Sequence, residues 1–239
     1  MKALFLFLLV VLSSILSCSQ PSQSGVPIFS ISNGKIISDS RFVDDFYDSQ
    51  RADTLTYTTA ASTPINVQVG NAVYTVRTAR FIDWEDALGD PGYNVIEISK
   101  NDQVVFTHKQ MDALTDFYDY TFGGFDNLYG QSLRPFSNNN FFIEAPLSNE
   151  ATALFFAGWP YGTSPAPQLL IIVVTPNDVQ IVLNKNLNIN SVVRSGYNFS
   201  MVVQSRFVEW LDFAMTKPVN EAVLHTIFQH NGVLYFKDN

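Results

Sequence analysis

Flat aromatic rings are concentrated in two short segments that also contain glycine. Residues 117–129 read Phe-Tyr-Asp-Tyr-Thr-Phe-Gly-Gly-Phe-Asp-Asn-Leu-Tyr, and residues 159–162 read Trp-Pro-Tyr-Gly. Exposed rings can stack on a sugar or anchor a protein partner. In a chain with 20 Phe, 10 Tyr and 3 Trp, rings that cap the ends of a β-core are the more frequent case, so both roles stay open. The candidate ligand-binding residues are Tyr118, Tyr120, Phe122, Phe125, Tyr129, Trp159 and Tyr161.

Acidic side chains form two clusters. Oxygen ligands at this density can hold Ca²⁺, but neither spacing matches an EF-hand loop. We therefore interpret residues 83–90 as a polar turn and residues 112–119 as a solvated helix face, and expect no metal site. The clustered residues are Asp83, Glu85, Asp86 and Asp90, and then Asp112, Asp116 and Asp119.

Nucleophilic catalysis has little support in the sequence. A Ser–His–Asp triad would need one of the three histidines, His108, His225 or His230, and no Gly-x-Ser-x-Gly motif occurs. His225 and His230 are five residues apart, which suits a metal pair neither on a helix nor on a strand. The glycine motifs that cradle nucleotides are also missing. We expect no catalytic residue that the sequence could identify and no cofactor.

Composition excludes several classes of protein. The 22 Asp and Glu outnumber the 14 Lys and Arg, which argues against a nucleic-acid partner. A hydrophobic fraction of 46% is enough for a core and argues against disorder. The single cysteine excludes a disulfide framework.

Short alternating strands separated by turn residues run through the chain, and they predict hairpins. The expected fold is mostly β, an antiparallel sandwich or partly closed barrel of roughly eight to twelve strands, with a small β-propeller as the alternative. Short helices are predicted at 40–49, 109–120 and 205–216. The predicted strand pairs are 65–69 with 73–76, 93–99 with 104–107, 141–143 with 153–156, 169–174 with 179–183, and 224–230 with 233–236.

The N-terminus carries a targeting signal. Met1-Lys2 precedes an apolar run from Ala3 to Leu16, which is too short to cross a hydrocarbon core of about 30 Å. The segment Ile15-Leu16-Ser17-Cys18 overlaps the end of this run. It resembles the lipobox of bacterial lipoproteins, although a small residue is commoner at the position of Leu16.

The resemblance implies that Cys18 receives a lipid and becomes the mature N-terminus. Because Ser19 rather than Asp follows it, the resemblance implies the outer membrane of a Gram-negative host. Ordinary cleavage after Ser19 and an uncleaved anchor are the alternatives. The predicted organisation is a signal peptide (1–17), a flexible tether (18–27) and one domain (28–239), with a sub-boundary near 130–140 as an alternative.

We expect a lipid-anchored envelope protein that binds a protein or glycan partner without catalysis. The alternatives are an envelope hydrolase that uses two carboxylates and a structural lipoprotein of a larger assembly. With 22 acidic residues some pair would meet the spacing of a glycoside hydrolase by chance, so the sequence selects none.

Overall fold

Antiparallel strands account for almost all of the part that the computed structural model describes, which is residues 25–44, 58–61, 63–82, 92–111, 142–158, 168–206 and 222–239. Sixteen strands and one short 3₁₀-helix occur in these ranges. The predicted mostly-β sandwich is confirmed, with more strands than the sequence indicated.

The C-terminal sheet has the strand order β1-β16-β15-β14-β13. Val26 pairs with Phe236 and Pro27 with Tyr235, so two residues that the sequence analysis assigns to the tether form an edge strand. The strands are β1 (Val26–Pro27), β13 (Asn188–Ser195), β14 (Asn198–Arg206), β15 (Val223–His230) and β16 (Val233–Asp238).

The middle sheet has the order β12-β11-β10-β9. A separate hairpin, β2 with β3, lies beside β12, where the Ile36 N–H donates to Asp178 Oδ2 at 2.9 Å. The middle strands are β9 (Ile143–Ser148), β10 (Ala151–Gly158), β11 (Gln168–Thr175) and β12 (Asp178–Lys185), and the hairpin is β2 (Phe29–Ser32) and β3 (Lys35–Ser38).

In the N-terminal sheet, β4 and β5 pair with different parts of the long strand β6, and β7 and β8 follow on its other side. The strands are β4 (Thr58–Ala61), β5 (Ile65–Val69), β6 (Ala72–Ile82), β7 (Gly92–Lys100) and β8 (Gln103–Met111).

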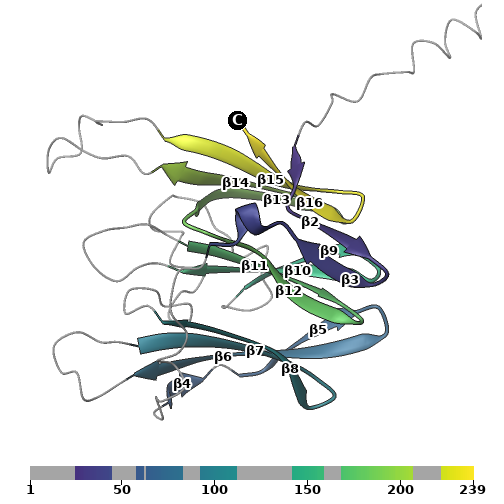
Figure 1. Ribbon diagram of the computed structural model, residues 1–239, viewed down its shortest axis with the longest axis vertical. Helices are drawn as coiled ribbons and strands as arrows, with labels where there is room; N and C mark the ends of the chain where they lie inside the picture. The colour runs from purple at the N-terminus through teal and green to yellow at the C-terminus, as the bar shows by residue number, and fades with distance from the viewer. Residues whose placement is uncertain are drawn as a thin grey trace, which may run out of the picture.

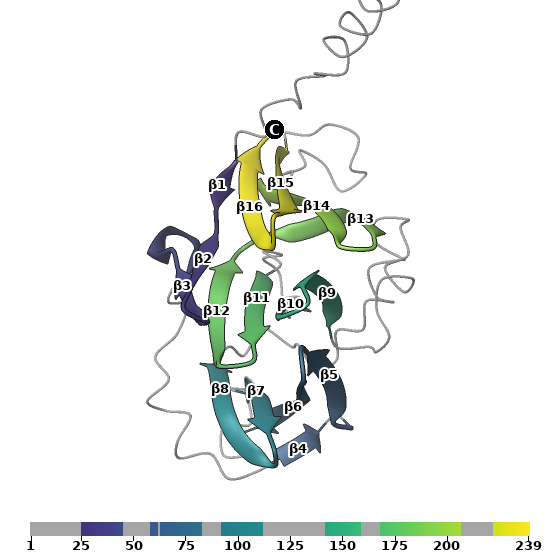
Figure 2. The ribbon, with the colours of Figure 1, turned by 90° about the vertical axis from the view of Figure 1, so that its right-hand side faces the viewer.

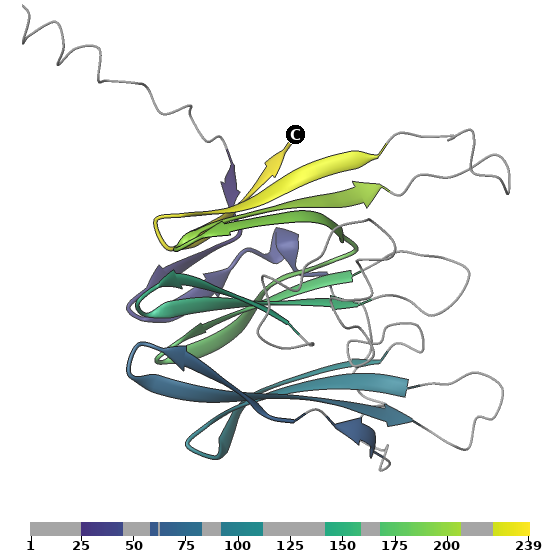
Figure 3. The same ribbon diagram turned by 180° about the vertical axis from the view of Figure 1, so that it is seen from behind.

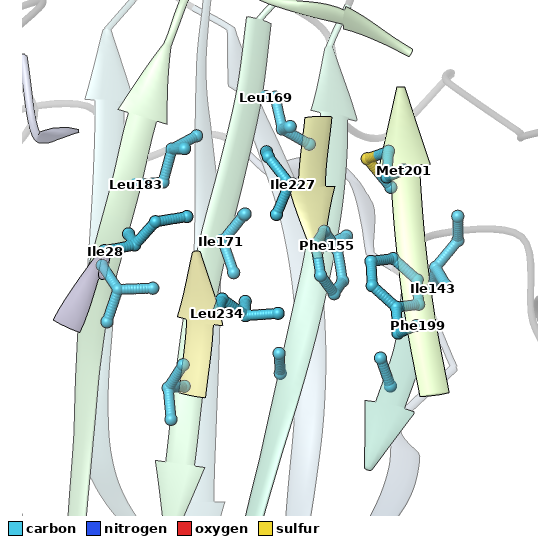
Figure 4. Close-up of a cluster of buried hydrophobic side chains, with 14 of the residues drawn as sticks. Ile28, Ile143, Phe155, Leu169, Ile171, Leu183, Phe199, Met201, Ile227 and Leu234 are labelled. Atoms are coloured by element: carbon cyan, nitrogen blue, oxygen red, sulfur yellow. The ribbon is translucent and has the colours of Figure 1, made fainter. Parts of the chain in front are cut away.

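The three sheets lie in layers, with the middle sheet between the other two (Figures 1 and 2). Every residue of β11 is buried. Because side chains alternate along a strand, Ile171 points into the core shared with the C-terminal sheet and Ile172 into the core shared with the N-terminal sheet. Figure 4 shows the first core, in which the rings of Phe155 and Phe199 lie 4.7 Å apart.

Each layer contains one four-stranded meander, and the three meanders follow one another along the chain. Propeller blades use the same unit, but here the meanders stack face to face instead of surrounding a channel. A short sequence pattern recurs in two of the meanders. Arg80-Phe-Ile-Asp-Trp84 begins near the end of β6, and Arg206-Phe-Val-Glu-Trp210 begins at the last residue of β14; each of these is the second strand of its meander. Trp159 directly follows the second strand of the remaining meander.

Four of the five predicted strand pairs are confirmed. The fifth, 141–143 with 153–156, is confirmed where Ile143 pairs with Phe155, but its first strand is β9 (Ile143–Ser148) and lies further along the chain than predicted. The hairpin of β13 and β14 was missed, because Gly196-Tyr197 is a weaker turn signal than Asn-Gly.

The helix predictions are wrong where the structure describes them. Residues 109–111 continue strand β8, because Met111 pairs with Tyr93, and residues 205–206 belong to β14. Of the helix predicted at 40–49, the described part contains the 3₁₀-helix η1 (Ser40–Phe42), and the backbone is extended at Val43. The remaining residues of these three segments, and the sub-boundary near 130–140, lie outside the described ranges.

Because the two faces of β11 pack in two different cores, shortening a side chain on either face should destabilise the fold. Ile171→Ala and Ile172→Ala each remove a side chain with no exposed surface, so each is expected to lower the free energy of unfolding by about 2–5 kcal/mol. Val193→Ala, at a side chain 65% exposed, should change it by less than about 0.5 kcal/mol. Denaturant unfolding measures all three. An Ile172→Ala protein as stable as the Val193→Ala protein would contradict the packing of the N-terminal sheet on the middle one.

Glu144 of the edge strand β9 provides a test of electrostatics. Burial raises the pKa of its carboxyl, and the charge of Arg194 offsets part of that effect. The folded state therefore holds the proton more tightly than the unfolded state, and the ionised carboxylate destabilises the fold above the ordinary pKa of 4.5. Glu144→Gln should raise the melting temperature at pH 7.5, and the gain should shrink as the pH falls towards 4.5 and be lost below it. Glu150→Gln, at an exposed turn, is the control; an unchanged or lower melting temperature for Glu144→Gln at pH 7.5 would refute the account.

Candidate binding face at the hairpin turns

The hairpin turns of the three sheets gather along one side of the stack, on the right in Figure 1 and on the left in Figure 3. Neighbouring turns are in contact. A methyl group on Gly70 would lie 3.5 Å from Pro176 Cγ and 3.6 Å from the carbonyl oxygen of Asn149. One on Gly232 would lie 3.7 Å from the carbonyl oxygen of Leu147. The turns thus form one continuous surface, here called the turn face.

Asparagine recurs in these turns for a conformational reason. Three two-residue turns have positive φ at both central positions, which is the geometry that matches the twist of a tight hairpin. Asn and Asp accept this region better than other residues with a Cβ. Their amide and carboxylate groups consequently lie on the turn face. The three turns are Asn33-Gly34, Asn101-Asp102 and Asn231-Gly232.

Hydrogen bonds between layers hold the turns in place. Tyr74 of β6 donates its hydroxyl proton to the carbonyl oxygen of Thr175 at 2.7 Å. Burial, and then the charge of Asp178, raise the pKa of this tyrosine, which keeps it a neutral donor. Lys100 Nζ donates to the carbonyl oxygen of Pro176, also at 2.7 Å. These contacts join the N-terminal sheet to the middle sheet.

A second set joins the middle sheet to the C-terminal sheet. Gln229 Nε2 donates to the carbonyl oxygen of Leu147 at 3.0 Å. The Tyr197 hydroxyl donates to Asn149 Oδ1 at 2.6 Å. Half of the surface of Tyr197 is exposed, so the side chain is held at its hydroxyl and stays accessible to solvent.

Between these turns lies a hollow of about 440 Å³, here called the amide hollow. Its lining contains amide, hydroxyl and ring groups but no carboxylate, lysine or arginine. Asn231 Nδ2 lies 3.1 Å from His230 Nε2 at its rim. The lining residues are Leu147, Ser148, Asn149, Tyr197, Asn198, Gln229, His230, Asn231 and Gly232.

A second hollow of about 650 Å³, here called the lysine hollow, lies between the turns of the N-terminal and middle sheets. Lys100, Asn101 and Glu150 line it, and Asn149 borders both hollows. The two hollows are therefore parts of one face rather than separate sites.

Side-chain amides suit a neutral polar ligand. Each carries an acceptor oxygen and two N–H donors, so it can donate a hydrogen bond to a hydroxyl or acetamido group or accept one from it. Polar groups in precise positions fix the orientation of a bound ligand, and here Asn149 and Gln229 are held by their neighbours beside the exposed Tyr197. These groups make the turn face the candidate binding surface.

The aromatic candidates of the sequence analysis cannot be compared with this face. Tyr118, Tyr120, Phe122, Phe125, Tyr129, Trp159 and Tyr161 lie outside the described residues, as do Cys18 and both acidic clusters. The amide hollow was missed, although the asparagines in successive turns were a signal that could have indicated it.

The described residues contain no group of three or more His, Cys, Asp or Glu side chains placed to hold a metal ion. They also contain no helix with the length and hydropathy needed to cross a bilayer.

Comparison with known proteins gives no match: no family model, no curated protein and no solved structure matches the chain. The geometry of the turn face is therefore the basis for the function proposed below.

Proposed function

We propose that this chain is a lipid-anchored bacterial envelope protein that binds a glycan on its turn face without chemically changing it. The observation that carries the proposal is the amide hollow, which offers hydrogen-bond donors and acceptors beside the half-exposed Tyr197. Such a lining complements sugar hydroxyls and the acetamido groups of amino sugars.

The charge and shape of the hollow favour a glycan over a protein partner. Protein interfaces are centred on buried aromatic and apolar anchors. The amide hollow is instead lined mainly by polar side chains, and its described lining residues carry no carboxylate. The alternative of a hydrolase with paired carboxylates has less support at this face, because the two hollows together contain one carboxylate, that of Glu150.

The hollow is also preorganised. Asn149 is held by the hydroxyl of Tyr197, and Gln229 by the backbone of the neighbouring turn at Leu147. Groups that are fixed before binding lose less conformational entropy when the ligand arrives. A rigid scaffold of stacked sheets with a polar face on one side fits a binding module better than an enzyme that must close over its substrate.

A lipid anchor at Cys18 would leave the turn face accessible. Strand β1 places the start of the described chain in the C-terminal sheet, at one end of the stack (Figure 2). A tether of residues 18–24 would span at most about 25 Å from the lipid on Cys18. The turn face runs along the side of the stack, so attachment at one end leaves it accessible to solvent.

Two substitutions test the glycan site. Asn149→Ala and Tyr197→Ala should each weaken binding of a tetramer of N-acetylglucosamine about tenfold, because each removes a group that would contact the sugar. Titration calorimetry measures the affinity, and cosedimentation with purified peptidoglycan tests the polymer. Asn66→Ala, which alters an exposed asparagine on the outer face of the N-terminal sheet, is the matched control.

Equal binding by all three variants would exclude the amide hollow as the site. Failure of the unaltered protein to bind either probe would refute glycan binding itself.

Mass spectrometry of the mature N-terminus tests the anchor. We expect a chain that begins at a lipid-modified Cys18, and a Cys18→Ala variant that is no longer processed to this form. A mature chain that begins at Gln20 without lipid would show ordinary secretion instead.

A further inference from the structure

A second group of polar side chains lies at the opposite end of the C-terminal sheet from the turn 231–232. His225 Nε2 is 2.6 Å from Ser205 Oγ, and His225 Nδ1 is 2.8 Å from Asp238 Oδ1. We propose that these three residues form a nucleophilic site that hydrolyses small carboxylic esters through an acyl-serine intermediate. This activity goes beyond the proposed binding function and does not depend on it.

Strand pairing brings the three residues together from distant positions in the sequence. They lie on β14, β15 and β16, which are neighbours in the sheet, and His225 pairs directly with Asp238. A bulge between Gln204 and Arg206 leaves Ser205 without a register partner on β15. Bulges redirect a side chain and recur beside active sites.

The imidazole is held in one orientation. His225 lies 4.8 Å, centroid to centroid, from the ring of Phe236, which in turn lies 5.5 Å from Phe42. Only 12% of the His225 side chain is exposed, whereas Asp238 is 87% exposed. The ring is therefore fixed against an apolar wall, and its polar edge is turned to the serine and the carboxylate.

The end of β16 is fixed as well. The Asn239 N–H donates to the carbonyl oxygen of Leu224 at 3.3 Å, and the Thr226 hydroxyl donates to Asn239 Oδ1 at 2.8 Å. These bonds hold Asp238 beside His225 although its carboxylate is exposed.

The hydrogen-bond pattern assigns the roles. An ionised carboxylate is only an acceptor, so the Asp238 contact places the imidazole proton on Nδ1. Nε2 is then the acceptor for the hydroxyl proton of Ser205. This is the arrangement in which a histidine activates a serine and a carboxylate orients the histidine.

The reaction needs only the ester and water. Ser205 Oγ forms a bond to the ester carbonyl carbon while its proton passes to Nε2. The bond from that carbon to the alkoxy oxygen then breaks, and Nε2 returns the proton to the departing alcohol. Water, deprotonated by the same nitrogen, attacks the acyl-serine and releases the carboxylic acid and the free Ser205 hydroxyl.

The two proposed sites can be tested independently. His225 and His230 are five positions apart along β15, and His230 lies at the turn face, so the two are about 17 Å apart. A substitution at Ser205 should therefore leave glycan binding unchanged.

The experiment uses the full-length protein, extracted in detergent and treated with a fluorophosphonate probe. We expect the probe on Ser205, identified by peptide mass, and hydrolysis of p-nitrophenyl acetate that falls about 100-fold or more in Ser205→Ala and His225→Gln. Asp238→Asn should lower the rate about tenfold, a smaller loss because solvent already surrounds this carboxylate. Ser195→Ala, on β13 of the same sheet, should retain full labelling and activity.

Circular dichroism first establishes that each protein is folded. A serine that only links neighbouring strands would not react, so a folded, unlabelled wild-type protein overturns the proposal. Labelling that persists in Ser205→Ala also overturns it. If His225→Gln does not fold, the wild type and Ser205→Ala, which differ by one oxygen atom, still decide between the two outcomes.

Discussion

The middle sheet has to be covered on both faces, and the arrangement of the other layers follows from this requirement. Strand β11 is buried along its whole length, with successive side chains in two different cores. Leaving either face in water would expose a continuous apolar surface, which monomeric soluble proteins avoid. The N-terminal and C-terminal sheets supply the two covers. A strand buried on both faces reads as an unbroken apolar run, as Leu169 to Val174 does.

Stacking three meanders has a geometric consequence for function. Turns from all layers are brought to one side of the stack, where hydrogen bonds such as that of Tyr197 with Asn149 join them. The opposite side holds the strand ends that place Ser205, His225 and Asp238 in a row. One scaffold thus carries both the proposed glycan site and the proposed serine site. The proposed glycan site is built from contacts between sheets, whereas Ser205, His225 and Asp238 lie on neighbouring strands of one sheet.

Turn residues and alternating apolar residues, which are local signals, made the β-architecture predictable. The candidate sites depend on pairing between residues far apart in the sequence, which such signals do not reveal. Turn residues such as Asn231-Gly232 identify a hairpin from adjacent positions alone. The apolar pattern at 109–120 favours a helix, but it is too short to reveal that Met111 pairs with Tyr93 in a strand. Ser205 and Asp238 are 33 positions apart in sequence, so only the order of strands brings them to the same histidine. The amide hollow likewise depends on contacts between turns of different sheets.

Native-state hydrogen exchange tests the central claim, the burial of the middle sheet between two covering sheets, most directly. Amides of a strand covered on both faces exchange only when a covering layer separates or the whole domain unfolds. We predict the slowest exchange in β10 and β11, with opening free energies close to the global value. The outer strands β5 and β13 should exchange faster through local opening. Exchange in β11 as fast as in β13 would contradict the three-layer account, because it would show that one face of the middle sheet is open to water.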